Sequence, residues 1–179
     1  RQKRPLGLGH AVLCARDLIG DEPFAVLLAD DLIDAQVPCV RQLLNVFEER
    51  GESVVALMQV ASEEVHRYGV IGGPQIESRL YEIGTMVEKP SRQDAPSRLA
   101  IIGRYVLRPE IFSQLGRLVP GRGGEIQLTD GLVSLLQERK VYGYEFIGER
   151  YDVGDKLGFV MANVAYALKR PELRGEMKT

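Results

Sequence analysis

The stretch FAVLLADD, residues 24–31, constrains the fold more than any other part of this chain. An unbroken apolar run follows Pro23 and ends in two aspartates. The run is too short for a typical helix, so it predicts a strand over residues 24–29 that is buried on both faces. In open parallel α/β sheets, ligands bind just beyond the carboxyl ends of the strands. The sequence therefore predicts a ligand site at Asp30 and Asp31.

Helix-like and strand-like segments alternate along the rest of the chain. Apolar residues at helical spacing predict helices, and short apolar or alternating runs predict strands. The predicted helices cover residues 10–18, 40–49, 109–118, 128–139 and 157–168, and the predicted strands cover residues 53–60, 80–87, 100–107 and 141–147. Thr129 or Asp130 is available as the N-cap of its helix. This alternation predicts an α/β fold with a mostly parallel sheet, which a hairpin-like segment over residues 68–87 makes mixed.

Size, charge and cysteine content narrow the class of protein. A chain of 179 residues is long enough for one domain with a sizeable core, so residues 1–179 are predicted to form a single domain. The net charge of -2 argues against a protein that binds nucleic acid electrostatically. Cys14 and Cys39 are the only cysteines, which favours a reducing, cytoplasmic setting. No apolar run approaches the roughly 20 residues that span a bilayer.

The acidic residues at strand ends suggest a cation site. Mg²⁺ prefers one or two carboxylates together with substrate phosphates. Because successive side chains of a strand point to opposite faces, at most one of Asp30 and Asp31 is expected to face the ligand. Asp152, in the segment YDVG, is a second acid at a strand end that can converge on the same metal. The residues alone also allow a helix cap, a solvated charge, or a turn-forming Asp-x-Gly.

Two further motifs suit a phosphorylated ligand. The segment GLGH at residues 7–10 leads into a helix, and glycine N–H groups at a helix start suit a phosphate or a planar base edge. Glu88 and Lys89 precede Pro90; a carboxylate accepts sugar hydroxyls while an adjacent ammonium neutralises a phosphate. A plain turn and a surface ion pair are the structural alternatives for these two motifs.

Taken together, these motifs resemble those of a known family, and the similarity runs nearly end to end. The segments that carry it are GLGHAVLCA, FAVLLADD, YGV, MVEKPSRQDAPSRLAIIGRYVL, GGEIQLTD and YDVGDKLGF. Their order and spacing are similar to the successive motifs of bacterial UTP–glucose-1-phosphate uridylyltransferases, also called UDP-glucose pyrophosphorylases. The resemblance implies a Rossmann-like nucleotidyltransferase fold, with a mixed, mostly parallel sheet flanked by helices.

The resemblance also implies an activity in carbohydrate metabolism. Enzymes of this family transfer UMP from UTP to glucose 1-phosphate and release pyrophosphate, with Mg²⁺ as cofactor. The implied partners are therefore UTP, glucose 1-phosphate and the product UDP-glucose, with no nucleic acid and no membrane. Family members are commonly dimers or tetramers, so a homo-oligomer is expected.

Individual site residues carry over from the family's motifs by the same resemblance. Asp30 and Asp152 match its two Mg²⁺-binding aspartates, and Lys89 matches the lysine that binds the sugar-side phosphate. These three are the expected catalytic residues. The other expected substrate-binding residues are Gln2 and Gly7 for the uracil base, and Gly69, Glu88 and Gly103 for the sugar. Asp31 stands where the family often has an apolar residue, so in the full-length enzyme Asp31→Ala is expected to leave most of the turnover and Asp30→Ala to abolish it.

One departure from the family's pattern affects the expected activity. The family's N-terminal strand, its G-x-G-T-R loop and the lysine after it clamp the triphosphate, and none of them is found in this sequence. The chain is therefore expected to be a fragment that lacks the N-terminal part of the fold, with little or no pyrophosphorylase activity alone. The alternatives are a related transferase for another nucleotide or sugar phosphate, a non-catalytic nucleotide-sugar-binding module, and a receiver-like signalling domain.

Overall fold

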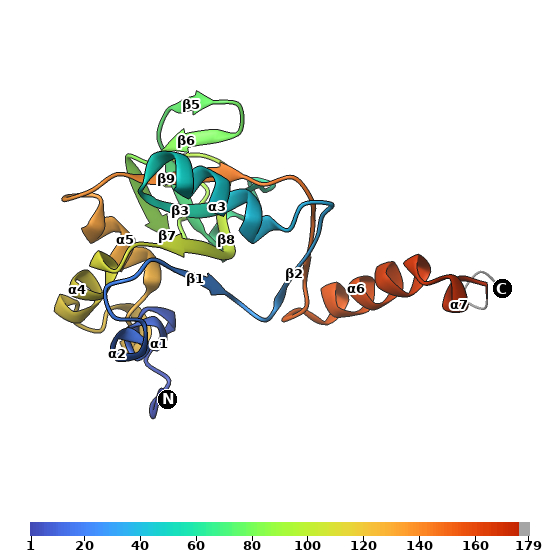
Figure 1. Cartoon of the computed structure of the whole chain (residues 1–179), viewed down its shortest axis with the longest axis horizontal. Coiled ribbons are helices and arrows are strands. Elements are labelled where there is room, and N and C mark those ends of the chain that lie inside the picture. Colours follow the sequence, from blue (N-terminus) through green and yellow to red (C-terminus); the bar gives the residue numbers. More distant parts are fainter. Residues whose placement is uncertain (176–179) are drawn as a thin grey trace.

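The computed structural model describes residues 1–175, except for the side chain of Arg122. An eight-stranded sheet forms the centre of the chain, and a long helix near the C-terminus extends away from this body (Figure 1). A separate ribbon pairs two strands that lie far apart in the sequence. The mixed sheet flanked by helices that the sequence predicts is confirmed.

The strands form two sheets. The large sheet contains β1 (Phe24–Leu27), β3 (Ser53–Gln59), β4 (Gly69–Gly72), β5 (Gln75–Glu77), β6 (Leu80–Glu82), β7 (Thr85–Glu88), β8 (Leu99–Leu107) and β9 (Val141–Glu145). Its strand order is β5-β6-β9-β3-β8-β4-β7, and β1 also pairs with β8. The ribbon pairs β2 (Asp31–Asp34) with β10 (Glu149–Asp152).

The helices mostly follow the predicted spacing. They are α1 (Leu8–Leu13), α2 (Arg16–Ile19), α3 (Cys39–Arg50), α4 (Glu110–Arg117), α5 (Leu128–Leu135), α6 (Lys156–Lys169) and α7 (Pro171–Arg174), with single 3₁₀ turns at Val65–Arg67 and Arg122–Gly124. The C-cap of α3 is Gly51, whose φ of 69° is a left-handed conformation that glycine adopts without a steric cost. The N-cap of α6 is Asp155, whose carboxylate accepts the N–H groups of Leu157 and Gly158, both at 3.1 Å.

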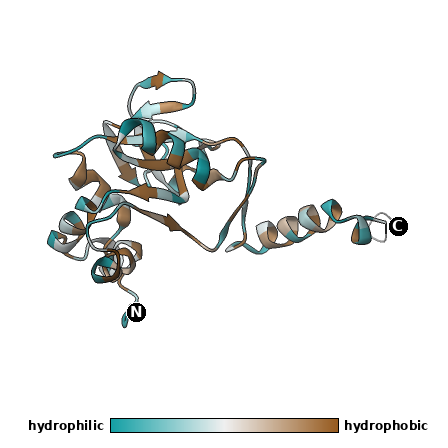
Figure 2. Ribbon diagram, viewed as in Figure 1, coloured by the Kyte–Doolittle hydropathy of each residue, from teal (hydrophilic) through white to brown (hydrophobic). Residues whose placement is uncertain are grey.

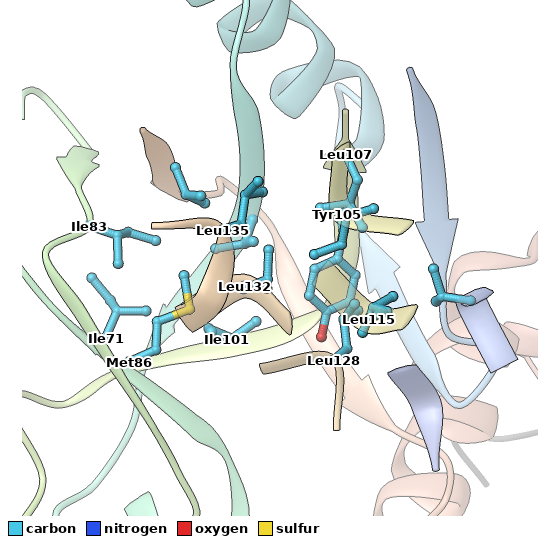
Figure 3. Close-up of a cluster of buried hydrophobic side chains, with 14 of the residues drawn as sticks. Ile71, Ile83, Met86, Ile101, Tyr105, Leu107, Leu115, Leu128, Leu132 and Leu135 are labelled. Carbon is cyan, nitrogen blue, oxygen red and sulfur yellow. The ribbon is translucent and has the colours of Figure 1, made fainter. Parts of the chain in front are cut away.

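The core lies on both faces of β3, because its successive side chains point in opposite directions. Val54 and Ala56 pack with the apolar side chains of α3, whereas Val55 and Leu57 pack with those of α4 and α5. All four are fully buried. Figure 3 shows the second cluster, where leucines of α4 and α5 meet isoleucines of the sheet. Burial of each large aliphatic side chain contributes about 1.5–3 kcal/mol, so these two clusters hold the helices to the sheet.

Two expectations about the sheet are wrong. β1 ends at Leu27, its side chains alternate between half-buried and exposed, and it pairs antiparallel with β8, so it is not buried on both faces. Among the described ladders only β3 and β9 pair in parallel, so the sheet is not mostly parallel. The physical reason is that no helix lies between β4 and β8 to carry the chain back across the sheet. Consecutive strands there return antiparallel.

Several predicted segments have different bounds in the structure. The segment predicted as one strand over residues 80–87 forms β6 and β7, which pair with different neighbours, β9 and β4. The helix predicted over residues 10–18 is divided into α1 and α2, and the helix predicted over residues 128–139 ends at Leu135. Thr129 and Asp130 lie inside α5, whose N-cap is Gln127, so their predicted capping role is wrong.

Helix α6 buries little of its surface. Ala162 is its one buried residue, and much of the helix is coloured as hydrophobic in Figure 2. Its exposed apolar side chains are Leu157, Phe159, Val160, Met161, Val164 and Tyr166. None of the described helices has both the length and the apolar character that crossing a membrane requires.

Candidate functional site

A cavity of about 250 Å³ lies between the large sheet and the β2–β10 ribbon. Its walls come from the turn after β1, the ends of β4 and β7, the middle of β8, the start of α5, and β10. The predicted site residues that line this cavity are Asp30, Gly69, Glu88, Gly103 and Asp152. The fold thus brings together residues that are spread over most of the chain.

The two aspartates of the predicted cation site lie close together. The N–H of Val153 donates to the carbonyl oxygen of Asp30 at 2.8 Å, which joins the end of the ribbon to the turn after β1. A Cβ on Gly154 would lie 3.2 Å from Oδ1 of Asp152 and 3.3 Å from Oδ2 of Asp30, so both carboxylates approach one point. No cluster of three or more possible metal ligands occurs among residues 1–175. A pair of carboxylates suits a cation such as Mg²⁺, which takes its other ligands from water and phosphates.

Asp31 also lines the cavity, contrary to the expectation that at most one of the two neighbouring aspartates faces it. The strand predicted over residues 24–29 ends early, so Asp30 lies in a turn and Asp31 begins β2. Strand alternation therefore does not apply to this pair. The carboxylate of Asp31 is 6% exposed and forms an ion pair with the guanidinium of Arg150, which is 9% exposed. Its Oδ2 accepts the N–H of Gly103 at 2.7 Å.

Arg150 connects the cavity-lining groups with one another. Its Nη1 donates to the hydroxyl of Tyr68 at 3.1 Å, and its Nη2 lies 3.3 Å from Oδ2 of Asp152. Burial opposes protonation of the guanidinium, but the charge and hydrogen bonds of Asp31 and Tyr68 raise the pKa of Arg150 above its ordinary value. A permanent positive charge therefore sits beside the carboxylates of Asp31 and Asp152.

Glu88 also lines the cavity and is held by α5. The hydroxyl of Thr129 donates to Oε2 of Glu88 at 2.7 Å. Gly69 lies behind this pair, where a Cβ would come within 3.0 Å of the Thr129 hydroxyl oxygen. Burial, followed by the charges of Asp31 and Glu88, raises the pKa of Tyr105, so this phenol stays protonated. The wall combines one oriented carboxylate with a neutral phenol.

Lys89 is adjacent to Glu88 but does not line the cavity. Its ammonium lies 3.8 Å from Oε1 of Glu88 and is half-exposed. Its φ of 46° is left-handed, and the next residue is the buried Pro90. A left-handed residue other than glycine costs about 1–3 kcal/mol and is concentrated at functional sites. This backbone is held by the N–H of Lys89, which donates to the carbonyl oxygen of Tyr68 at 2.9 Å.

Gln2 and Gly7 form a second cluster at the start of α1. The side-chain amide of Gln2 donates to the carbonyl oxygen of Gly7 at 3.1 Å and lies 2.9 Å from Nδ1 of His10. Neither Gln2 nor Gly7 lines the cavity, but the intervening Leu8 does. The predicted base-reading residues therefore lie beside the cavity and not within its walls.

Six cavity-lining residues with polar side-chain groups were not predicted from the sequence: Arg67, Tyr68, Tyr105, Gln127, Thr129 and Arg150. The signal for Arg150 was present, since it lies two residues before Asp152 in a strand and side chains at that spacing share a face. Thr129 had no such signal, because its partner Glu88 is 41 residues away.

Comparisons with known proteins identify what the chain is similar to. A family model described as "Nucleotidyl transferase" matches residues 1–169. A protein from Bacillus subtilis, named UTP–glucose-1-phosphate uridylyltransferase, is 51% identical over 177 residues, which are 99% of this chain and 61% of that protein. The chain thus spans less than two thirds of the length of this relative.

Solved structures agree with this similarity. A UDP-glucose pyrophosphorylase complexed with UDP-glucose matches with a TM-score of 0.92 and 47% identity, covering 95% of this chain and 65% of that one. A UTP-bound UDP-glucose pyrophosphorylase from Acinetobacter baumannii matches with a TM-score of 0.87 and 35% identity, covering 99% of this chain and 62% of that one.

Proposed function

Because the chain belongs to the nucleotidyl transferase family, we propose that its cavity serves the transfer of UMP from UTP to glucose 1-phosphate, giving UDP-glucose and pyrophosphate. The observation that carries this proposal is the convergence of Asp30, Asp152 and Glu88 on one cavity. Similarity to relatives with this name, and to solved structures that hold UDP-glucose and UTP, supports it.

Glu88 and Lys89 are the proposed sugar-phosphate residues. The carboxylate of Glu88 accepts hydroxyl groups of glucose, and its orientation comes from the hydroxyl of Thr129. The ammonium of Lys89 lies outside the cavity wall, next to Glu88, where it meets a phosphate attached to the sugar. Gly103 and Gly69 keep the floor of the cavity free of side chains.

Asp30 and Asp152 are the proposed ligands of a magnesium ion. Their carboxylates approach one point, and their number suits a cation that shares its coordination with phosphate oxygens. When bound, Mg²⁺ supplies positive charge that stabilises negative charge on the phosphates. Asp31 is a poor candidate for a ligand, because both of its oxygens are already engaged by Arg150 and Gly103.

The protein's own contribution is mainly positioning. Attack by a sugar-phosphate oxygen on the α-phosphorus of UTP needs alignment of two anions and neutralisation of their charge, with little covalent help. Lys89 reduces the repulsion between those anions, and Glu88 fixes the sugar. The cluster of Gln2 and Gly7 beside the cavity is the proposed reader of the uracil edge. A homo-oligomer in a cytoplasmic setting is proposed on the same family similarity.

Binding tests this function directly on the purified chain. We expect calorimetry to detect UDP-glucose, with higher affinity when Mg²⁺ is present, and to detect at least tenfold weaker binding by the Glu88→Gln variant. A matched control is Glu82→Gln, which lies at the surface and pairs with Lys140. Absence of binding by the wild-type chain, or equal affinity for UDP-glucose and for ADP-glucose, would contradict the proposal.

Turnover is a separate question for this chain. Pyrophosphate release from UTP and glucose 1-phosphate is expected to be low or absent for residues 1–179, because no G-x-G-T-R loop is found in this sequence. Binding of UDP-glucose without Mg²⁺ enhancement and without turnover would instead favour a non-catalytic nucleotide-sugar-binding module.

A further inference from the structure

We propose that Asp31 and Arg150 form a buried positioning pair that sets the orientation of the Asp152 carboxylate. This inference rests on the proposed function, because it treats Asp152 as a metal ligand. It assigns a role to two residues that have no part in the mechanism above, and it replaces the expectation that Asp31 is dispensable.

The first part of the pair, Asp31, is fixed from three sides. Its Oδ1 accepts from Nε of Arg150, and its Oδ2 accepts the N–H of Gly103 at 2.7 Å. The guanidinium of Arg104 donates to its carbonyl oxygen. Asp31 also lies directly opposite Asp152 in the β2–β10 ladder. The carboxylate of Asp31 therefore provides a rigid anchor on the strand that faces the metal-binding aspartate.

The second part, Arg150, is held by Asp31 and in turn contacts Asp152. Both residues are on β10, two positions apart, so their side chains leave the same face of the strand. Nη2 of Arg150 lies 3.3 Å from Oδ2 of Asp152. The ring of Tyr68 lies 5.4 Å from the guanidinium and its hydroxyl accepts from Nη1, so the guanidinium has little freedom to rotate.

The two oxygens of Asp152 consequently have different surroundings. Oδ2 faces the guanidinium groups of Arg150 and Arg67, the latter at 3.4 Å. Oδ1 accepts the N–H of Gly154 at 3.2 Å and lies next to the point that Asp30 also approaches. Binding of Oδ2 by arginine thus turns Oδ1 toward Asp30. The same positive charge reduces the electrostatic repulsion between the carboxylates of Asp30 and Asp152.

A purely structural role of the salt bridge predicts a different result. An ion pair that only stabilises the fold needs no contact with Asp152, so its loss would lower the free energy of unfolding and leave cation affinity unchanged. A positioning pair alters cation affinity, since partners that orient metal ligands typically change it about 10- to 100-fold.

The experiment measures Mn²⁺ affinity in the presence of saturating UDP-glucose, by electron paramagnetic resonance of free Mn²⁺. Arg150→Lys keeps the charge and loses the planar fork, and Arg150→Met loses both. We expect Mn²⁺ affinity to fall at least tenfold in both variants. The double variant Asp31→Asn with Arg150→Met removes both buried charges together, so it gives a folded sample if Arg150→Met alone does not fold.

Controls separate this inference from the proposed function. Arg16→Met removes the arginine of an exposed Arg–Asp pair and is expected to leave Mn²⁺ affinity unchanged. Failure of the wild-type chain to bind UDP-glucose would contradict the function itself. Three outcomes would overturn the positioning role alone. The wild-type chain binds UDP-glucose but no Mn²⁺, the Arg150 variants keep the wild-type Mn²⁺ affinity, or Arg150→Met binds Mn²⁺ more tightly.

Discussion

The hydroxyl of Thr129 donates a 2.7 Å hydrogen bond to Oε2 of Glu88, which joins the first turn of α5 to the end of β7. This bond fixes one oxygen of a carboxylate that lines the cavity. A long acidic side chain has many rotamers, so binding of a sugar through it is favoured when one orientation is already selected.

Thr129→Val tests this orientation with little change of shape. A hydrogen bond to a charged group contributes about 1.5–3 kcal/mol, and 1.4 kcal/mol corresponds to about tenfold in affinity. We expect UDP-glucose to bind about tenfold more weakly, as measured by calorimetry. Thr129→Ser keeps the hydroxyl and is the matched control. If Thr129→Ser bound UDP-glucose as weakly as Thr129→Val, the loss of affinity would come from a change in packing and not from loss of the hydrogen bond.

Lys89 combines a left-handed backbone with a proposed phosphate contact, and two substitutions separate these properties. Lys89→Ala and Lys89→Gly both remove the ammonium, so both are expected to weaken UDP-glucose binding to the same extent. Glycine adopts φ of 46° without the steric cost, so urea denaturation should give Lys89→Gly a free energy of unfolding about 1 kcal/mol above that of Lys89→Ala. Equal stability of the two variants would argue against backbone strain at this position.

Gly103 lets β8 approach the turn after β1. A Cβ there would lie 2.6 Å from Cβ of Leu28 and closer still to Oδ2 of Asp31. Gly103→Ala is therefore expected to lower the free energy of unfolding by about 1–3 kcal/mol through overpacking. Gly116, in α4, has no atom within 4 Å of an added Cβ, so Gly116→Ala should be neutral or stabilising by up to about 1 kcal/mol. A destabilisation of similar size in both variants would contradict this explanation.

Substitution of Asp31 should destabilise the fold more than substitution of Asp30, although the sequence indicated Asp30 as the more important residue. Asp31 is buried with Arg150, whereas Asp30 is exposed. Removing one partner of a buried ion pair leaves an uncompensated charge and typically costs about 3–5 kcal/mol. We expect Asp31→Ala to unfold at much lower urea concentration than Asp30→Ala, while Asp30→Ala abolishes Mn²⁺ binding. Similar denaturation midpoints would mean that Arg150 finds another partner.

The two cysteines should react at very different rates. Burial raises the pKa of the Cys39 thiol to about 12, with Arg104 opposing and Asp31 adding to the shift, while Cys14 is exposed. At pH 8 the thiolate fraction of Cys39 is on the order of one in ten thousand. Ellman's reagent is expected to label one thiol quickly in the native chain and the second only after unfolding. A Cys14→Ser variant that still reacts quickly would show that the packing of α3 against the sheet does not keep Cys39 buried.

Local sequence patterns predicted several elements well. The spacing of apolar residues predicted α3, the short apolar run predicted β3, and the helix predicted from Pro109 onward corresponds to α4. These features depend on residues within one or two turns, so a short window contains the whole physical cause. For the same reason, the polar, proline-bearing segment over residues 91–98 forms neither a helix nor a strand.

The site was predicted in part. The family motifs indicated Asp30, Glu88 and Asp152, which do line one cavity, and Gln2 and Lys89, which do not. The expectation from strand alternation that at most one of Asp30 and Asp31 faces the ligand was wrong, because a turn separates β1 from β2 and both residues line the cavity. The alternation of side chains between the two faces applies within one strand, so it does not relate neighbouring residues that belong to different elements.

The sequence by itself determined which segments are helical or extended, which are apolar, and which acids belong to the family's motifs. Only the tertiary structure decided that β2 pairs with β10, that Asp31 holds Arg150, and that Thr129 holds Glu88. The physical reason is that periodicity specifies which face of an element is buried but not which element covers it. FAVLLADD therefore predicted a strand and a ligand site, while the partner strand that completes this site lies more than a hundred residues away.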